Sequence, residues 1–71
     1  MTLSEIIDAH PEWTTRTHVE AWLTMVAREA GEYADSAIAE FGASLDECGE
    51  VSVAHLPDEA VEEIKLAALA E

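Results

Sequence analysis

Cationic side chains are scarce in this sequence, and their scarcity excludes more functions than any motif suggests. Three lysines and arginines face sixteen aspartates and glutamates among 71 residues, which gives a formal net charge of −13. A surface of this sign repels phosphate, so we do not expect direct binding to nucleic acid. The same surface attracts basic surfaces on other proteins.

Cysteine is equally scarce, because Cys48 is the only one. One cysteine cannot form a disulfide within the chain, and a lone thiol is typical of a reducing compartment. Residues 1–10 contain no basic residue and no long apolar run, so we expect no signal peptide, and no stretch is long enough to span a bilayer. We therefore expect a cytoplasmic protein without membrane association, in which residues 1–71 form a single acidic helical domain with a modest core.

The sequence also lacks the spacings that mark catalytic and metal sites. Its three histidines and Cys48 do not fall at the H-E-x-x-H or C-x-x-C intervals that zinc sites use. The three glycines are isolated, so none belongs to a phosphate-binding loop. Carboxylates are abundant, but acid-base catalysis needs them in a desolvated cleft, for which a chain of this size has little room. We predict no catalytic, cofactor-binding or metal-binding residue, and hence no enzyme.

Apolar residues recur every three or four positions across residues 15–41, which predicts an α-helix with one buried face. The stripe consists of Val19, Leu23, Val26, Ala30, Tyr33, Ala37 and Phe41. We expect its middle part, from Val26 to Tyr33, to face the core. Because the stripe continues in phase through Gly31, we favour one long helix bent at that glycine. The alternative is two helices, with Asp35 or Ser36 capping the second.

Shorter helices are predicted on either side of this central one. Thr2 and Glu5 match the capping-box pattern and begin a helix over residues 3–9, which the proline after His10 ends. One of the threonines at positions 14, 15 and 17 caps the central helix. The last helix begins near Pro57 or Asp58. Its inner face consists of Val61, Ile64, Ala68 and Leu69.

Residues 43–54 show the least regular pattern. Ser44 and Glu47 are spaced to cap one helical turn, and a turn is typical of Cys48 followed by glycine. Val51 to Val53 alternate like a strand, yet the sequence shows no second strand that would pair with them. The predicted fold class is therefore all-α, a small three- to four-helix bundle with one long central helix and at most a short extended segment at 51–53.

The acidic residues are concentrated towards the C-terminus. Residues 43–71 contain eight acids, with Lys65 as the sole base. The chain's net charge also exceeds the magnitude of about 2–8 that keeps a small domain soluble. We therefore predict a contact surface for a protein with a basic surface. Its predicted residues are Asp46, Glu47, Glu50, Glu59, Glu62, Glu63 and Leu66.

In size and charge the chain resembles small acidic proteins of phages and other mobile elements, including some anti-restriction and anti-CRISPR proteins. The resemblance is one of composition, with no shared motif. It implies that carboxylates spaced along helices imitate phosphate rows and occupy the nucleic-acid groove of a partner. We therefore predict a non-enzymatic acidic protein-binding module that acts as an inhibitor by mimicking nucleic acid.

A second interpretation is a helical homo-oligomer that serves as a structural or adaptor subunit, with a charge that only maintains solubility or adapts the chain to high salt. Large apolar residues are numerous for so small a fold, and an apolar patch among them predicts a homodimer. The residues concerned are Trp13, Trp22, Met25, Tyr33 and Leu66. Trp13 itself is expected to plug the core, the alternative being an exposed anchor for a partner.

Overall fold

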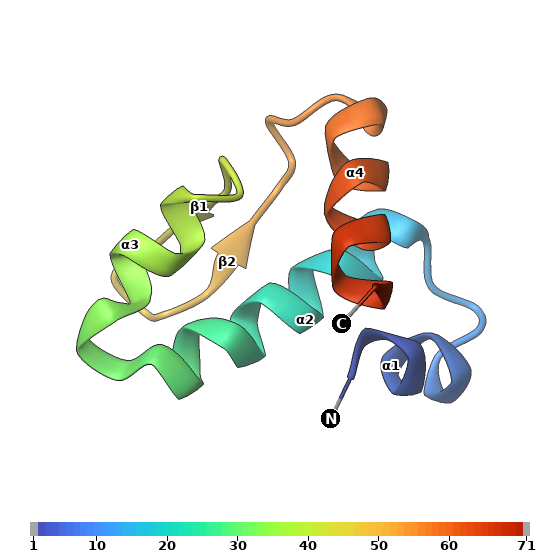
Figure 1. Cartoon of the computed structure of the whole chain (residues 1–71), viewed down its shortest axis with the longest axis horizontal. Helices are drawn as coiled ribbons and strands as arrows, with labels where there is room; N and C mark the ends of the chain where they lie inside the picture. Colours follow the sequence, from blue (N-terminus) through green and yellow to red (C-terminus); the bar gives the residue numbers. More distant parts are fainter. Residues whose placement is uncertain (1, 71) are drawn as a thin grey trace.

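The chain is mostly helical, with one short hairpin (Figure 1). The computed structural model describes residues 2–70. In chain order its elements are α1 (Leu3–Ala9), α2 (Thr15–Ala30), the 3-10 helix η1 (Gly31–Tyr33), α3 (Ala34–Ala39), β1 (Ser44–Leu45), β2 (Val51–Ser52) and α4 (Asp58–Leu69). This arrangement confirms the predicted fold class, a small helical bundle in which the helical residues 15–39 are central.

Capping residues begin the helices where the sequence predicts them. The Thr2 hydroxyl accepts a hydrogen bond from the backbone N–H of Glu5, which fixes the start of α1. Among the three candidate threonines, Thr14 caps α2, because its hydroxyl accepts the N–H of Thr17. Pro57 directly precedes α4, at the position where a missing N–H costs the helix nothing.

The central stretch is broken at Gly31, so it forms two helices joined by a turn and not the single bent helix that the sequence favours. Gly31 has φ of 59° and ψ of −117°, which residues with a Cβ rarely adopt. As a result α3 turns back and packs against α2 (Figure 1). Tyr33 precedes α3 and no side chain caps it, so the alternative cap at Asp35 or Ser36 is also wrong.

This break changes which side chains face the core. Val19 and Leu23 are fully buried, as the stripe predicts, and Val26 is half-buried. Tyr33 is 69% exposed, so its prediction as a core residue is wrong. The helical period does not continue through the turn at Gly31, and beyond it Ile38 becomes the fully buried residue.

Residues 44–52 form a hairpin within the chain. β1 pairs antiparallel with β2, and Ser44 lies opposite Ser52. The helical turn predicted at Ser44 is therefore wrong. The extended segment, for which the sequence shows no second strand, pairs through Val51 and Ser52 with Leu45 and Ser44 of the same chain. A strand of two residues shows no alternation that the sequence could reveal.

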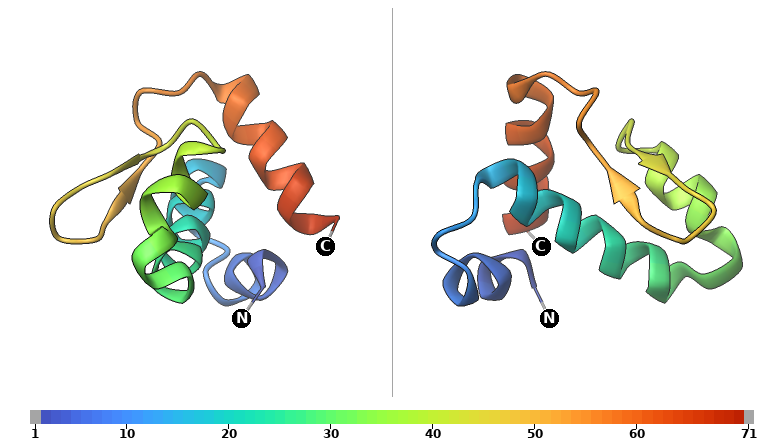
Figure 2. Two further views of the ribbon diagram at one scale, coloured as in Figure 1. Left: turned by 60° about the vertical axis from the view of Figure 1, so that its left-hand side comes forward. Right: turned by 180° about the vertical axis from the view of Figure 1, so that it is seen from behind.

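Helix α4 crosses α2 and also packs on α1 (Figure 2). Its buried residues are Val61, Ile64 and Ala68. Leu69 was also predicted on this inner face, but it is 43% exposed, because each residue is rotated about 100° from the one before it and the helix ends there. The largest fully buried side chains are Leu3, Val19, Leu23, Ile38 and Val53.

Candidate protein-binding surface

The outer face of α4 carries four of the seven predicted contact residues. Glu59, Glu62 and Glu63 are exposed, and Leu66 lies beside them with 64% of its surface exposed. They face outward because Val61, Ile64 and Ala68 occupy the face that packs on the rest of the fold. These four residues, Glu59, Glu62, Glu63 and Leu66, are called the α4 surface below.

Among the residues that the structure describes, no cation lies within ion-pair distance of the carboxylates of the α4 surface. Within residues 2–70 there are two ion pairs, Arg16 with Asp58 at 2.7 Å and His10 with Glu12 at 3.7 Å, the second requiring a protonated imidazole. Neither includes a carboxylate of the α4 surface. Lys65, the base nearest to them in sequence, also takes part in neither. No cation among residues 2–70 therefore compensates the charge of this surface.

The other three predicted contact residues lie in the loop between β1 and β2. One carboxylate oxygen of Asp46 accepts hydrogen bonds from the backbone N–H groups of Cys48, at 2.9 Å, and Glu50, at 2.8 Å. Asp46 also donates its own N–H to the carbonyl of Glu50. Asp46 therefore holds the loop together, while the side chains of Glu47 and Glu50 remain exposed.

The structure does not bring these two acidic groups together. The loop projects from one side of the molecule and α4 lies on the other, and both views in Figure 2 show this separation. The seven predicted residues therefore form two separate acidic surfaces, of which only the α4 surface lies on a helix of twelve residues.

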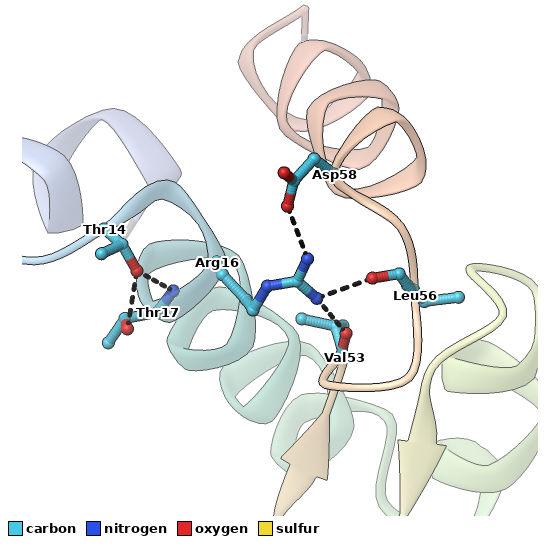
Figure 3. Close-up of polar contacts among 6 residues, drawn as sticks. All are labelled: Thr14, Arg16, Thr17, Val53, Leu56 and Asp58. Atoms are coloured by element: carbon cyan, nitrogen blue, oxygen red, sulfur yellow. Dashed lines mark hydrogen bonds and ion pairs between the residues drawn. The ribbon is translucent and has the colours of Figure 1, made fainter.

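A half-buried arginine that sequence reasoning missed holds α4 in place (Figure 3). One guanidinium nitrogen of Arg16 donates to the carbonyls of Val53, at 2.5 Å, and Leu56, at 2.8 Å. The other nitrogen reaches Asp58, the first residue of α4. One turn along α2, the carboxylate of Glu20 accepts the N–H of Val53 at 2.8 Å.

Arg16 therefore donates to backbone carbonyls of the segment before α4, and Glu20 accepts a backbone N–H from it. We call these two side chains the α2 clamp. One pattern in the sequence could have predicted the α2 clamp: two opposite charges, Arg16 and Glu20, lie four residues apart at the start of a helix in a chain with very few cations. The sequence could show that the two side chains share a face of α2. It could not show that the backbone of residues 53–58 crosses that face.

The apolar residues that predict a homodimer do not form one patch. Trp22 is buried and meets Phe41 edge-on, with ring centroids 5.7 Å apart. Trp13 and Met25 are half-buried and pack against the core, which agrees with Trp13 as a core plug. Tyr33 and Leu66 are exposed, on η1 and α4 respectively.

Two of the three histidines contact backbone carbonyls, and the third stacks on a tryptophan. Nε2 of His18, which is buried, lies 2.7 Å from the carbonyl oxygen of His10, and Nε2 of His55 lies 2.8 Å from that of Gly42. A carbonyl only accepts, so Nε2 is the donor in both contacts. The imidazole of His10 stacks on Trp13 with ring centroids 3.7 Å apart.

No group of three histidine, cysteine or acidic side chains within residues 2–70 is placed to hold a metal ion. In the same part of the chain, no helix has the length and apolar character needed to cross a membrane. Comparison of the chain with models of protein families, with curated proteins and with solved structures finds no match.

Proposed function

We propose that this chain is a non-enzymatic acidic protein-binding module that works in the cytoplasm. It docks the α4 surface on a basic, nucleic-acid-binding surface of a partner and inhibits it as a nucleic-acid mimic. The observation that carries the proposal is the uncompensated charge of Glu59, Glu62 and Glu63 on one exposed helical face.

The charge density at the start of α4 is close to that of a nucleic acid. Asp58 is paired with Arg16, which leaves Glu59, Glu62 and Glu63, and the first and last of these are four residues apart. At 1.5 Å per residue they span about 6 Å, so their mean axial spacing is roughly 3 Å, against about 3.4 Å per charge along one strand of DNA. A groove built to bind phosphates therefore meets a similar density of charge on α4, over a short length.

Leu66 adds an apolar contact at one end of these charges. It follows Glu62 and Glu63 by four and three residues, which places all three on neighbouring positions of the helix surface. Exposed charges steer the approach of a basic partner, whereas a desolvated apolar side chain slows its release. The combination supports a specific complex in which association depends on salt.

The test is capture of partners from a lysate on the immobilised full chain, at about 0.05 M and about 0.2 M salt. We expect nucleic-acid-binding proteins among those retained at low salt, and we expect a DNA or RNA oligonucleotide to elute them at constant ionic strength. The triple variant Glu59→Lys, Glu62→Lys and Glu63→Lys should lose them.

A charge-matched control distinguishes this surface from net charge. The variant Glu32→Lys, Asp35→Lys and Glu40→Lys changes the charge by the same amount on exposed positions of η1, α3 and the residue after it, and should retain the partners. Circular dichroism of both variants checks that the helices remain. Equal loss in both triples, or retention in the α4 triple, would sink the proposal.

The homo-oligomer remains the second candidate, because Leu66 and Leu69 are 64% and 43% exposed on neighbouring turns of one helix. Two such helices from two copies could bury these leucines against each other. The acids beside them carry the same sign in both copies, which opposes that contact. A homodimer through α4 would hide the α4 surface, so partner capture by a dimeric chain would argue against this interface.

A further inference from the structure

The seam that holds α4 to the rest of the fold is small. Its buried side chains are Val61, Ile64 and Ala68, while the two leucines of the helix are largely exposed. The remaining attachment is polar, because the α2 clamp binds the backbone of residues 53–56 and the carboxylate of Asp58. Helix α4 therefore depends on a few apolar contacts and on one arginine.

Charge repulsion acts against this attachment. Helix α4 contains four acids and Lys65, a net charge of −3, so the rest of the chain carries −10 of the total of −13. The molecule measures 30 by 25 by 22 Å. The screening length is about 30 Å at 0.01 M salt and about 3 Å at 1 M, so at low salt every charge acts across the whole molecule and at high salt only neighbours interact.

Salt affects the two contributions unequally. The repulsion runs through solvent between exposed carboxylates, and salt largely screens it. Arg16 donates to the carbonyls of Val53 and Leu56 at 2.5 and 2.8 Å, and because these bonds are half-buried and their acceptors are neutral, salt screens them less. Its ion pair with Asp58, whose side chain is 99% exposed, is screened like the repulsion. Salt therefore weakens the repulsion on α4 more than it weakens the contacts that hold the helix, and added salt favours the docked state of α4.

We propose that ionic strength gates the docking of α4, which is packed on α2 and α1 at high salt and is the first element to open as salt is lowered. The packing of α3 and the hairpin on α2 is expected to stay closed under the same conditions, because α2 contacts both α3 and β2 and Ile38 of α3 is fully buried. This proposal does not depend on a binding partner, since it concerns the isolated chain.

The test is amide hydrogen exchange of the full chain at about 0.01, 0.1 and 1 M sodium chloride. We expect the amides of α4 to gain about tenfold more protection than those of α2 between the lowest and the highest salt. Equal gains in both helices would show that the chain opens as a whole, and no gain in α4 would show that repulsion is too weak. Either result overturns the proposal.

Two sets of variants should shift the salt concentration at which α4 becomes protected, in opposite directions. Replacing Glu59, Glu62 and Glu63 by glutamine should protect α4 already at the lowest salt. The matched control, Glu32→Gln with Asp35→Asn and Glu40→Gln, removes the same number of charges from the rest of the chain. It leaves −3 on α4 facing −7 elsewhere in place of −10, so it should remove only about a third of the repulsion and change the salt dependence of α4 much less. If the two triple variants change the protection of α4 equally, the charges on α4 itself have no special effect and the proposal is overturned.

The opposite shift comes from weakening the clamp. Arg16→Met should raise the salt at which α4 becomes protected, whereas Arg28→Met, the same change at an exposed position on the same helix, should not.

Discussion

Removing the guanidinium of Arg16 should destabilise the fold far more than removing any other cation. Arg16→Met retains an apolar stem of similar length but leaves the carbonyls of Val53 and Leu56 without their donor. A hydrogen bond to a charged group is worth about 1.5–3 kcal/mol, so two are worth roughly 3–6 kcal/mol at full burial. The side chain is 31% exposed, and water replaces part of that loss. We therefore expect Arg16→Met to lower the free energy of unfolding by about 2–3 kcal/mol.

That loss is large for this chain. A stability of about 0.05–0.15 kcal/mol per residue gives roughly 4–11 kcal/mol for a domain of this length. Each kcal/mol shifts the melting temperature by about 4–8 °C in a domain of this size, so the variant should melt roughly 10–20 °C lower. Thermal unfolding followed by circular dichroism in about 0.1 M salt measures this directly.

Arg28→Met is the matched control. It changes the net charge by the same amount from the same helix, and Arg28 takes part in neither ion pair found within residues 2–70. Its melting temperature should move by less than the equivalent of about 0.5 kcal/mol. Equal shifts in the two variants would refute the reasoning, because the effect of Arg16 would then be one of net charge and not of its contacts with the segment before α4.

Three further outcomes are expected. Leu23→Ala should lower the free energy of unfolding in urea by about 2–5 kcal/mol, because Leu23 is fully buried. Leu66→Ala should lower it by less than about 0.5 kcal/mol, because Leu66 is exposed, and similar midpoints for the two variants would contradict the described core. Gly31→Ala should destabilise by about 1–3 kcal/mol through its backbone alone, since a Cβ there would meet no atom within 4 Å, and an unchanged melt would show that the turn tolerates a side chain. The second candidate, a homodimer through α4, predicts a dimer in sedimentation velocity at micromolar and higher concentrations that Leu66→Glu with Leu69→Glu abolishes, and monomer throughout would remove that candidate.

Local signals determined most of the helix boundaries. The hydroxyls of Thr2 and Thr14 each bond an N–H three residues along the chain, so a pattern of a few residues contains the whole interaction. The break at Gly31 is different, because a glycine inside a helix costs only about 1 kcal/mol and the stripe alone permits either outcome. Burial of Ile38 against distant residues favours the turn, and the sequence does not show those contacts.

The candidate site was only partly predictable for a related reason. Exposure of Glu59, Glu62 and Glu63 follows from the apolar spacing within α4. The separation of those residues from the loop at 46–50 depends on which way the hairpin projects, and two-residue strands leave no trace of that direction in the sequence. Nor does the sequence show that Asp46 uses its carboxylate to hold that loop.

The two ends of the described chain line one groove, and this has a consequence for the order in which the fold assembles. Thr2 and Ser4 face Ala68 and Leu69 across that groove, so α1 and α4 meet only after nearly the whole chain has closed on itself. Contacts between such distant residues slow folding, because the entropy of the intervening loop is lost before the contact forms. A circular permutant that joins residues 70 and 2 by a short linker and opens the loop at 46–50 makes the same contact local. It should fold faster than the natural connectivity, whereas the hairpin, now formed by the two ends of the new chain, should form last.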